Sequence, residues 1–178
     1  KRARWLMALY FVERTYAIFT SQDLLHWELL QKFDLPGDDE CPDLYPLTAD
    51  DGRTLWVYSG AHDMYFVGDF DENGLYQPIQ SVGQLSYNSQ SYAAQTYYYE
   101  PGKPVIRFAW NRSDIPGAPF NGSMCTPTEM TLKKHGDRYY LSALPIKSTE
   151  NLVVKSDKLD DFTLTHCTHE LGSKTCRI

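Results

Sequence analysis

Short runs of apolar, β-branched and aromatic residues recur along the chain, separated by turns rich in Asp, Gly and Pro. From Trp5 to Thr20 the residues are bulky and break only at Glu13-Arg14, which predicts two strands joined by a tight turn. No segment shows the sustained 3.6-residue period of an amphipathic helix. The pattern therefore predicts an all-β protein, and periodicity alone leaves a sandwich, a barrel or a propeller open.

The strands predicted after this hairpin are short and follow one another at close intervals. They are expected over 28–33, 43–47, 55–59, 64–69, 75–79, 91–99, 105–110, 130–134 and 139–145. From about Asn151 the composition turns polar and charged. We therefore predict one β domain over residues 1–150, followed by a polar segment over residues 151–178.

Composition and charge narrow the classes of function. The chain has 178 residues, of which 42% are hydrophobic and 22% charged, the balance of an ordinary globular domain. Its net charge of -6 predicts no nucleic-acid or anionic-membrane partner and suits a neutral ligand such as a sugar. No run is long and apolar enough to cross a membrane and no signal peptide is visible, so both an extracellular and a cytoplasmic location stay open.

Neither the cysteines nor the histidines have the spacing of metal ligands. The four cysteines are widely separated and are predicted to be reduced thiols, although Cys167 and Cys176 have the alternative of pairing in an oxidising compartment. The five histidines are interpreted as surface or turn residues. We therefore predict no metal and no cofactor.

One stretch places two acids and a thiol between prolines. It runs from Glu40 to Leu47 and reads Glu-Cys-Pro-Asp-Leu-Tyr-Pro-Leu. A proline restricts the residue before it to extended conformations, so Cys41 is expected to be extended and Glu40 to project from a stiff segment. Such stiffness suits a carboxyl that must be aimed. The alternative, which composition alone favours, is a surface turn with solvated acids.

This stretch resembles the acid/base signature of glycoside hydrolase family 32, which includes invertases, inulinases and levanases. Five further blocks resemble family blocks in the family's order: Phe19 to Trp27, Tyr92 to Thr96, Trp110, Pro116 to Asn121 and Pro127 to Leu132. The resemblance covers Trp5 to Leu152 and leans toward bacterial exo-acting levanase- and inulinase-like members.

The resemblance implies a five-bladed β-propeller followed by a C-terminal β-sandwich. Residues 5–33 then correspond to the outer part of the second blade, 40–79 to the third, 91–132 to the fourth, and Tyr139 onward to the start of the fifth. Residues 151–178 become the linker and the start of the sandwich. On this interpretation the chain is an internal fragment that holds roughly blades two to five.

The resemblance also implies a retaining hydrolysis of β-fructofuranosidic bonds in sucrose or in fructans such as levan and inulin. Glu40 corresponds to the acid/base carboxyl, which must be protonated when it meets the leaving oxygen. The family's nucleophile lies in an Asn-Asp-Pro-Asn block and its transition-state-binding Asp in an Arg-Asp-Pro block, and neither occurs in these 178 residues. We therefore expect the chain alone to be inactive. The alternative is a non-catalytic carbohydrate-binding or interaction propeller.

Two further residues are candidates for substrate binding on the resemblance. Cys41 corresponds to a neighbour that packs behind the acid, for which the alternative is a small buried hydrophobe. Trp110 corresponds to a family Trp near the pocket and would stack on or edge the fructosyl ring, with core packing as the alternative. Asp43, by contrast, is expected to accept hydrogen bonds from backbone N–H groups at a strand end rather than to bind sugar.

Overall fold

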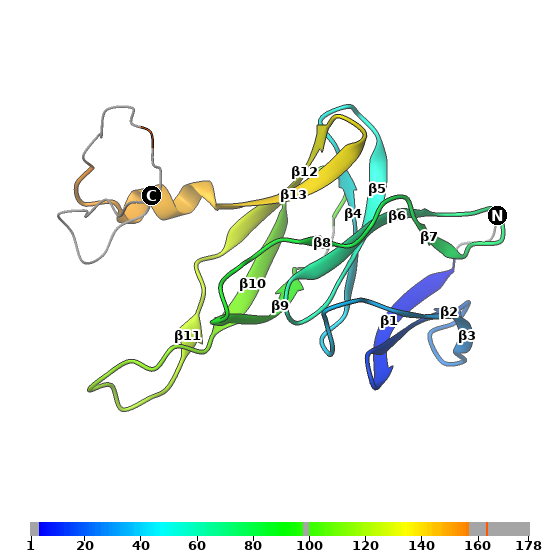
Figure 1. The fold of residues 1–178 in the computed structure, drawn as a ribbon, viewed down its shortest axis with the longest axis horizontal. Helices are drawn as coiled ribbons and strands as arrows, with labels where there is room; N and C mark the ends of the chain where they lie inside the picture. Colours follow the sequence, from blue (N-terminus) through cyan, green and yellow to red (C-terminus); the bar gives the residue numbers. More distant parts are fainter. Residues whose placement is uncertain (1–3, 98–99, 157–162, 164–178) are drawn as a thin grey trace. The chain divides into compact units, whose positions relative to one another are not determined.

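The computed structural model describes residues 4–97, 100–156 and 163. Within these residues thirteen strands form three antiparallel sheets, which confirms the all-β prediction (Figure 1). Contacts divide the chain into two units, 1–147 and 148–178, and all of the described strands belong to the first.

The first sheet is a three-stranded antiparallel sheet at the start of the chain. It consists of β1 (Trp5–Val12), β2 (Thr15–Ser21) and β3 (Glu28–Asp34), in that order. Glu13 and Arg14 form the two-residue turn between β1 and β2, and both have positive φ angles, 53° and 71°. Two left-handed residues match the twist of the strands that they join. The predicted hairpin is therefore confirmed.

The second sheet follows in the order β4-β5-β6-β7, and its fifth strand, β8, pairs with β6. Its strands are β4 (Asp43–Thr48), β5 (Thr54–Ser59), β6 (Met64–Phe70), β7 (Tyr76–Pro78) and β8 (Gly83–Gln84). The first four were predicted from the sequence within a few residues at each end. The fifth is only two residues long and has no hydrophobic pattern that would predict it.

The third sheet has the order β11-β10-β12-β13. Strands β11 and β12 pair with different ends of the same edge of β10, and β9 pairs with its opposite edge. Its strands are β9 (Ser91–Thr96), β10 (Val105–Asn111), β11 (Ser123–Met124), β12 (Thr128–His135) and β13 (Arg138–Pro145).

The expectation that Tyr139 begins a further blade is wrong. Strand β13 pairs with β12 over its whole length, from His135↔Arg138 to Thr128↔Pro145. The turn between them contains Gly136 at a φ of 59°, which lets the chain reverse tightly and return along the same sheet. Residues 138–145 therefore complete the third sheet.

Among the described residues, one short 3-10 helix, Lys147–Leu152, begins at the last residue of the first unit and continues into the second. No helix formed by the described residues is long and apolar enough to span a membrane. Of the predicted linker and sandwich segment, 151–178, the structure describes only 151–156 and 163, and these contain no strand. The rest of that prediction, including Cys167 and Cys176, lies outside the described residues.

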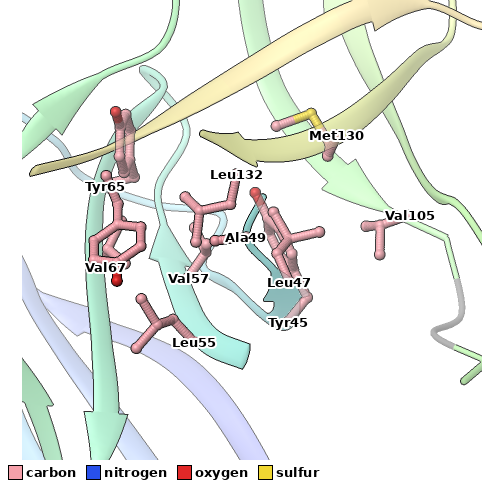
Figure 2. Close-up of a cluster of buried hydrophobic side chains, with 11 residues drawn as sticks. Tyr45, Leu47, Ala49, Leu55, Val57, Tyr65, Val67, Val105, Met130 and Leu132 are labelled. Atoms are coloured by element: carbon pink, nitrogen blue, oxygen red, sulfur yellow. The ribbon is translucent and has the colours of Figure 1, made fainter. Parts of the chain in front are cut away.

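Alternate residues of the central strands point into two different cores. In β5, Leu55 and Val57 belong to one buried cluster, whereas Tyr58 belongs to the other, with Trp56 packed against it. The first cluster lies between the second and third sheets (Figure 2). Its buried members are Tyr45, Leu47, Ala49, Leu55, Val57, Tyr65, Val67, Val105, Met130, Leu132 and Tyr139.

The second cluster joins the first and second sheets. Its buried members are Tyr16, Ile18, Leu35, Tyr58 and Tyr76, all fully inaccessible to solvent. The second sheet is thus covered on both faces, and each fully buried apolar side chain contributes about 1.5–3 kcal/mol. This packing gives rigid support to the segment that links β3 to β4, where Glu40 lies.

Candidate active site

Glu40 and Cys41 occupy a strained turn immediately before β4. Their φ angles are 58° and 40°, in the left-handed region that costs a residue with a side chain about 1–2 kcal/mol. The Glu40 carbonyl accepts hydrogen bonds from the Tyr16 hydroxyl at 3.0 Å and from the Ala61 N–H at 3.3 Å. The Cys41 carbonyl accepts one from Gln95 Nε2 at 3.2 Å. These contacts hold the turn, so the expectation of an extended Cys41 is wrong.

The Glu40 carboxylate is exposed and is held by a tyrosine from the third sheet. The Tyr92 hydroxyl donates a hydrogen bond of 2.6 Å to Glu40 Oε2. This bond is the main reason that the pKa of Tyr92 is raised, so the phenol stays protonated and remains a donor at neutral pH. One oxygen of Glu40 is thereby fixed, which orients the carboxyl group as a whole.

A bulge in β9 turns Tyr92 toward Glu40. Between the pairs Phe108↔Gln95 and Trp110↔Tyr92, two residues of β9 face one residue of β10. One of the two is Ala93, which has a φ of 52° and donates its N–H to the Ala61 carbonyl at 3.0 Å. Bulges re-aim the side chains beside them.

Three side chains surround the Tyr92 ring. The His62 ring lies edge-on at 4.9 Å, the Trp110 ring edge-on at 6.3 Å, and the Arg112 guanidinium stacks over it at 4.2 Å. Trp110 is 47% exposed in the described chain and presents an accessible aromatic surface. A side chain at Gly122 would come within 2.5 Å of Trp110 Nε1, so glycine is required beside this ring.

Asp38 fixes the loop between β5 and β6, next to the Glu40 turn. It is almost fully buried, and its carboxylate accepts hydrogen bonds from the backbone N–H groups of Asp39, His62 and Met64. Burial is the main influence on the pKa of Asp38 and raises it, while the backbone donors act in the opposite direction. At Gly60 a Cβ atom would lie 2.5 Å from Asp38 Cγ, so this close approach also requires glycine.

Asp38, Asp39 and His62 are the one group of possible metal ligands in the described part of the chain. One ligand atom from each lies within 4.8 Å of the others, and His62 Nε2 is 3.1 Å from Asp39 Oδ1. Sequence spacing missed the group because 22 residues or more separate the histidine from the acids. Both Asp38 oxygens already accept backbone hydrogen bonds, which reduces their availability to a cation.

Cys41 and Asp43 lie behind the exposed carboxylate. Cys41 is a half-buried free thiol, and burial, assisted by the nearby charge of Glu40, raises its pKa. The Asp43 carboxylate accepts hydrogen bonds from the N–H groups of Leu44 at 2.9 Å and Thr96 at 2.6 Å. The expected structural role of Asp43 is therefore confirmed. Burial raises the pKa of Asp43 above its ordinary value.

A buried ion pair ties the loop of the second sheet to the third sheet. Arg107 Nη2 donates to Asp63 Oδ1 at 2.5 Å and to Ser91 Oγ at 3.3 Å. Both charged side chains are at most 10% exposed. Sequence reasoning missed the pair, although the alternation in β10 carried a signal, since Arg107 stands between Val105 and Ala109 on the buried face of that strand.

The described residues thus form an all-β protein of antiparallel sheets, with an exposed carboxylate in the turn before β4 and aromatic rings next to the tyrosine that binds it. The model of the glycosyl hydrolases family 32 N-terminal domain matches residues 1–143. The chain belongs to this family.

Curated relatives agree with this membership. A levanase of Bacillus subtilis (strain 168) is 28% identical over 96% of the chain, and a fructan beta-fructosidase of Streptococcus mutans is 28% identical over 84% of it. The chain spans only 29% and 12% of these two proteins, respectively.

Solved structures share the fold. The exo-inulinase of Aspergillus awamori has a TM-score of 0.71 at 24% identity, covering 83% of this chain and 34% of the inulinase. A fructofuranosidase of Schwanniomyces occidentalis, solved as an E230A variant in complex with fructosylnystose, has a TM-score of 0.63 at 24% identity, covering 79% of this chain and 32% of its own.

Proposed function

We propose that this chain forms part of a retaining glycosidase that hydrolyses β-fructofuranosidic bonds in sucrose or fructans, with Glu40 as its acid/base. The observation that carries the proposal is the exposed Glu40 carboxyl, held by the Tyr92 hydroxyl at 2.6 Å in a turn that the surrounding loops fix. Relatives named as levanase and fructan beta-fructosidase support the substrate class. A five-bladed ring, of which the three described sheets are a part, belongs to the same proposal.

In the first step, protonated Glu40 donates its proton to the glycosidic oxygen while the bond between that oxygen and the fructosyl carbon breaks. The fructosyl group passes to a nucleophilic carboxylate, which the family resemblance assigns to a block not found in these residues. In the second step, the Glu40 carboxylate takes a proton from the attacking water. The fructosyl–enzyme bond then breaks, and Glu40 is again protonated.

The other residues of the site position groups rather than transfer protons. Tyr92 holds one carboxyl oxygen, so the second oxygen of Glu40 is the one presented to the substrate. The exposed Trp110 ring offers an apolar face to the C–H groups of a sugar. Cys41 shares the left-handed turn with Glu40 and so helps to fix the position of the acid.

The test is hydrolysis by the product of the reading frame that contains Lys1, once the frame is shown to encode Asn-Asp-Pro and Arg-Asp-Pro blocks upstream. Sucrose, inulin and levan are the substrates, and released reducing sugar is the readout. We expect Glu40→Gln to abolish nearly all turnover and Glu72→Gln, in an exposed turn, to leave it unchanged. Sugar binding without any hydrolysis would overturn the proposal and identify a carbohydrate-binding module instead.

A further inference from the structure

Arg112 lies against the side chain of Tyr92, and the mechanism proposed above gives it no role. Its guanidinium carbon stands over the Tyr92 ring, 4.2 Å from the ring centre. The hydroxyl of the same ring donates the hydrogen bond of 2.6 Å to Glu40 Oε2. A single aromatic ring therefore connects the guanidinium charge to the carboxyl of the proposed acid/base.

The pairing of β9 with β10 brings the arginine to this ring. Arg112 directly follows β10, and its N–H donates to the Gln90 carbonyl at 2.9 Å, which continues the pairing one residue beyond the strand. Tyr92 stands opposite Trp110 in that pairing. Arg112 lies two residues after Trp110, so both side chains project from the same face of the strand. The arginine is thus the diagonal neighbour of the tyrosine, within reach of its ring.

The guanidinium is also anchored at its edge. Arg112 Nη2 donates a hydrogen bond of 2.9 Å to the Ser89 carbonyl. The loop that carries this carbonyl is fixed in turn, because Asn88 Oδ1 accepts the Gln90 N–H at 2.8 Å. A planar guanidinium can stack with its face and donate at its edge at the same time, which the point charge of an ammonium cannot do. The position therefore suits arginine better than lysine.

A second arginine that lies over a tyrosine gives a comparison within the same chain. Arg138 stands 5.9 Å from the centre of the Tyr140 ring, and its Nη2 donates to the Ser81 carbonyl at 3.5 Å. Both distances are longer than those at Arg112. Arg112 thus combines the closer contact with a ring whose hydroxyl binds the proposed acid/base.

We propose that Arg112 is a positioning residue for proton transfer, which acts on Glu40 through the ring and hydroxyl of Tyr92. The inference rests on the proposed function. The guanidinium keeps the ring from turning away from Glu40, and its charge polarises the phenol, so that the hydroxyl becomes a stronger hydrogen-bond donor. Arg112 itself contacts neither the sugar nor the reacting atoms. Its loss should therefore slow turnover without weakening the binding of substrate.

The test measures kcat and KM in the active protein that contains this chain, on sucrose or levan, whichever is hydrolysed faster. Arg112→Met keeps the length of the side chain but removes its charge and its bond to Ser89. We expect kcat to fall by about three- to tenfold, as for the loss of a cation–π contact, and KM to stay within about twofold. Arg112→Lys keeps the charge and should recover part of the loss. Arg138→Met is the matched control and should leave both constants unchanged.

A double-mutant cycle separates an effect through Tyr92 from an effect by another route. In the Tyr92→Phe variant the ring remains but the hydroxyl is absent. Arg112→Met should then lower kcat by less than about twofold, because the bond through which it acts no longer exists. Arg112→Lys goes through the same cycle, so the test does not depend on the folding of one variant.

Three results would overturn the inference and leave the proposed function in place. They are an equal loss of kcat from Arg112→Met with and without the Tyr92 hydroxyl, a rise in KM at unchanged kcat, and an equal loss from Arg138→Met. The second result would mean that Arg112 binds the sugar directly. The proposed function fails by a different result, the absence of any hydrolysis by the protein that the complete reading frame encodes, and the inference then fails with it.

Discussion

The Tyr92 hydroxyl and Glu40 Oε2 lie 2.6 Å apart although 52 residues separate them in the chain. The contact joins the start of β4 to the bulge in β9, so it exists only when the second and third sheets are packed together. It also makes Tyr92 the residue whose removal tests the orientation of Glu40 most directly.

We expect Tyr92→Phe to lower kcat on sucrose by about tenfold or more in the active protein that contains this chain. The ring and its packing against His62, Trp110 and Arg112 are kept, whereas a hydrogen bond to a charged group, worth about 1.5–3 kcal/mol, is lost. KM should change much less. Steady-state kinetics supply the measurement, with Tyr97→Phe, at the exposed residue directly after β9, as the control. An unchanged kcat would show that Glu40 is held by its backbone alone.

Local pattern was enough to predict the hairpin at Glu13-Arg14 and the strand over 55–59, because both depend on neighbouring residues. It was also enough for Asp43, whose place at the start of a strand predicts backbone partners. The family motif singled out Glu40 as a candidate, because the stiffness of its proline-flanked segment fits a solvated surface turn equally well.

Contacts between sheets could not be predicted in the same way. The left-handed Cys41 depends on Gln95, and the pairing of Asp39 with His62 depends on how Asp38 folds the β5–β6 loop. Strand β13 was assigned to the wrong sheet because a strand's own sequence does not specify its partner. Arg107 is the instructive case, since a charge on a buried strand face predicts a buried partner without identifying Asp63.

Arg107→Met should destabilise the chain by about 3–5 kcal/mol, because it leaves the Asp63 charge buried without its partner. The double variant Arg107→Met/Asp63→Asn should recover most of that loss, since no buried charge remains and asparagine tolerates the φ of 65° at position 63. Urea unfolding followed by tryptophan fluorescence measures both.

Lys134→Met is the matched control for the buried pair, because it breaks an ion pair with Asp51 at 3.1 Å whose lysine is 42% exposed. Its effect should be much smaller than that of Arg107→Met. If Lys134→Met and Arg107→Met lowered the free energy of unfolding equally, the Asp63–Arg107 pair would not be the bond that joins the sheets.

The contributions of Asp43 and Asp71 to the stability of the chain should depend on pH in opposite directions. Burial raises the pKa of Asp43, so its contribution to stability is fully present below about pH 4, its unfolded pKa, and is lost as the pH rises through the higher native value. Relative to Asp43→Asn, the original chain should therefore gain stability when the pH falls from 7 to 4. The measurement is the unfolding midpoint in urea at each pH.

Asp71 lies partly exposed before the turn that leads to β7, and hydrogen bonds led by the one from the Leu75 N–H lower its pKa. Its contribution is present above the unfolded pKa and disappears as the pH falls through the native value. Relative to Asp71→Asn, the original chain should lose stability on acidification. If acidification changed stability in the same direction in both comparisons, the Asp43 carboxyl would not be desolvated, contrary to what its contacts imply.

Glu40→Gln is expected to lower turnover of sucrose by about three orders of magnitude in the active protein that contains this chain. The amide keeps the shape of the side chain and can still accept the Tyr92 hydrogen bond, but it delivers no proton, and general acid catalysis is typically worth about 10² to 10⁴. The KM for sucrose should change much less than kcat, because the binding contacts remain.

The leaving group decides whether this loss is due to proton donation. In a nitrophenyl fructoside the departing oxygen is a weak base that hardly needs a proton. Glu40→Gln should therefore slow cleavage of its glycosidic bond less than it slows cleavage of sucrose. Azide should then partly restore turnover of that substrate, since it attacks the fructosyl–enzyme bond without needing a base. Equal losses on both substrates, without rescue by azide, would mean that Glu40 supports the turn in which it lies and that another residue supplies the proton.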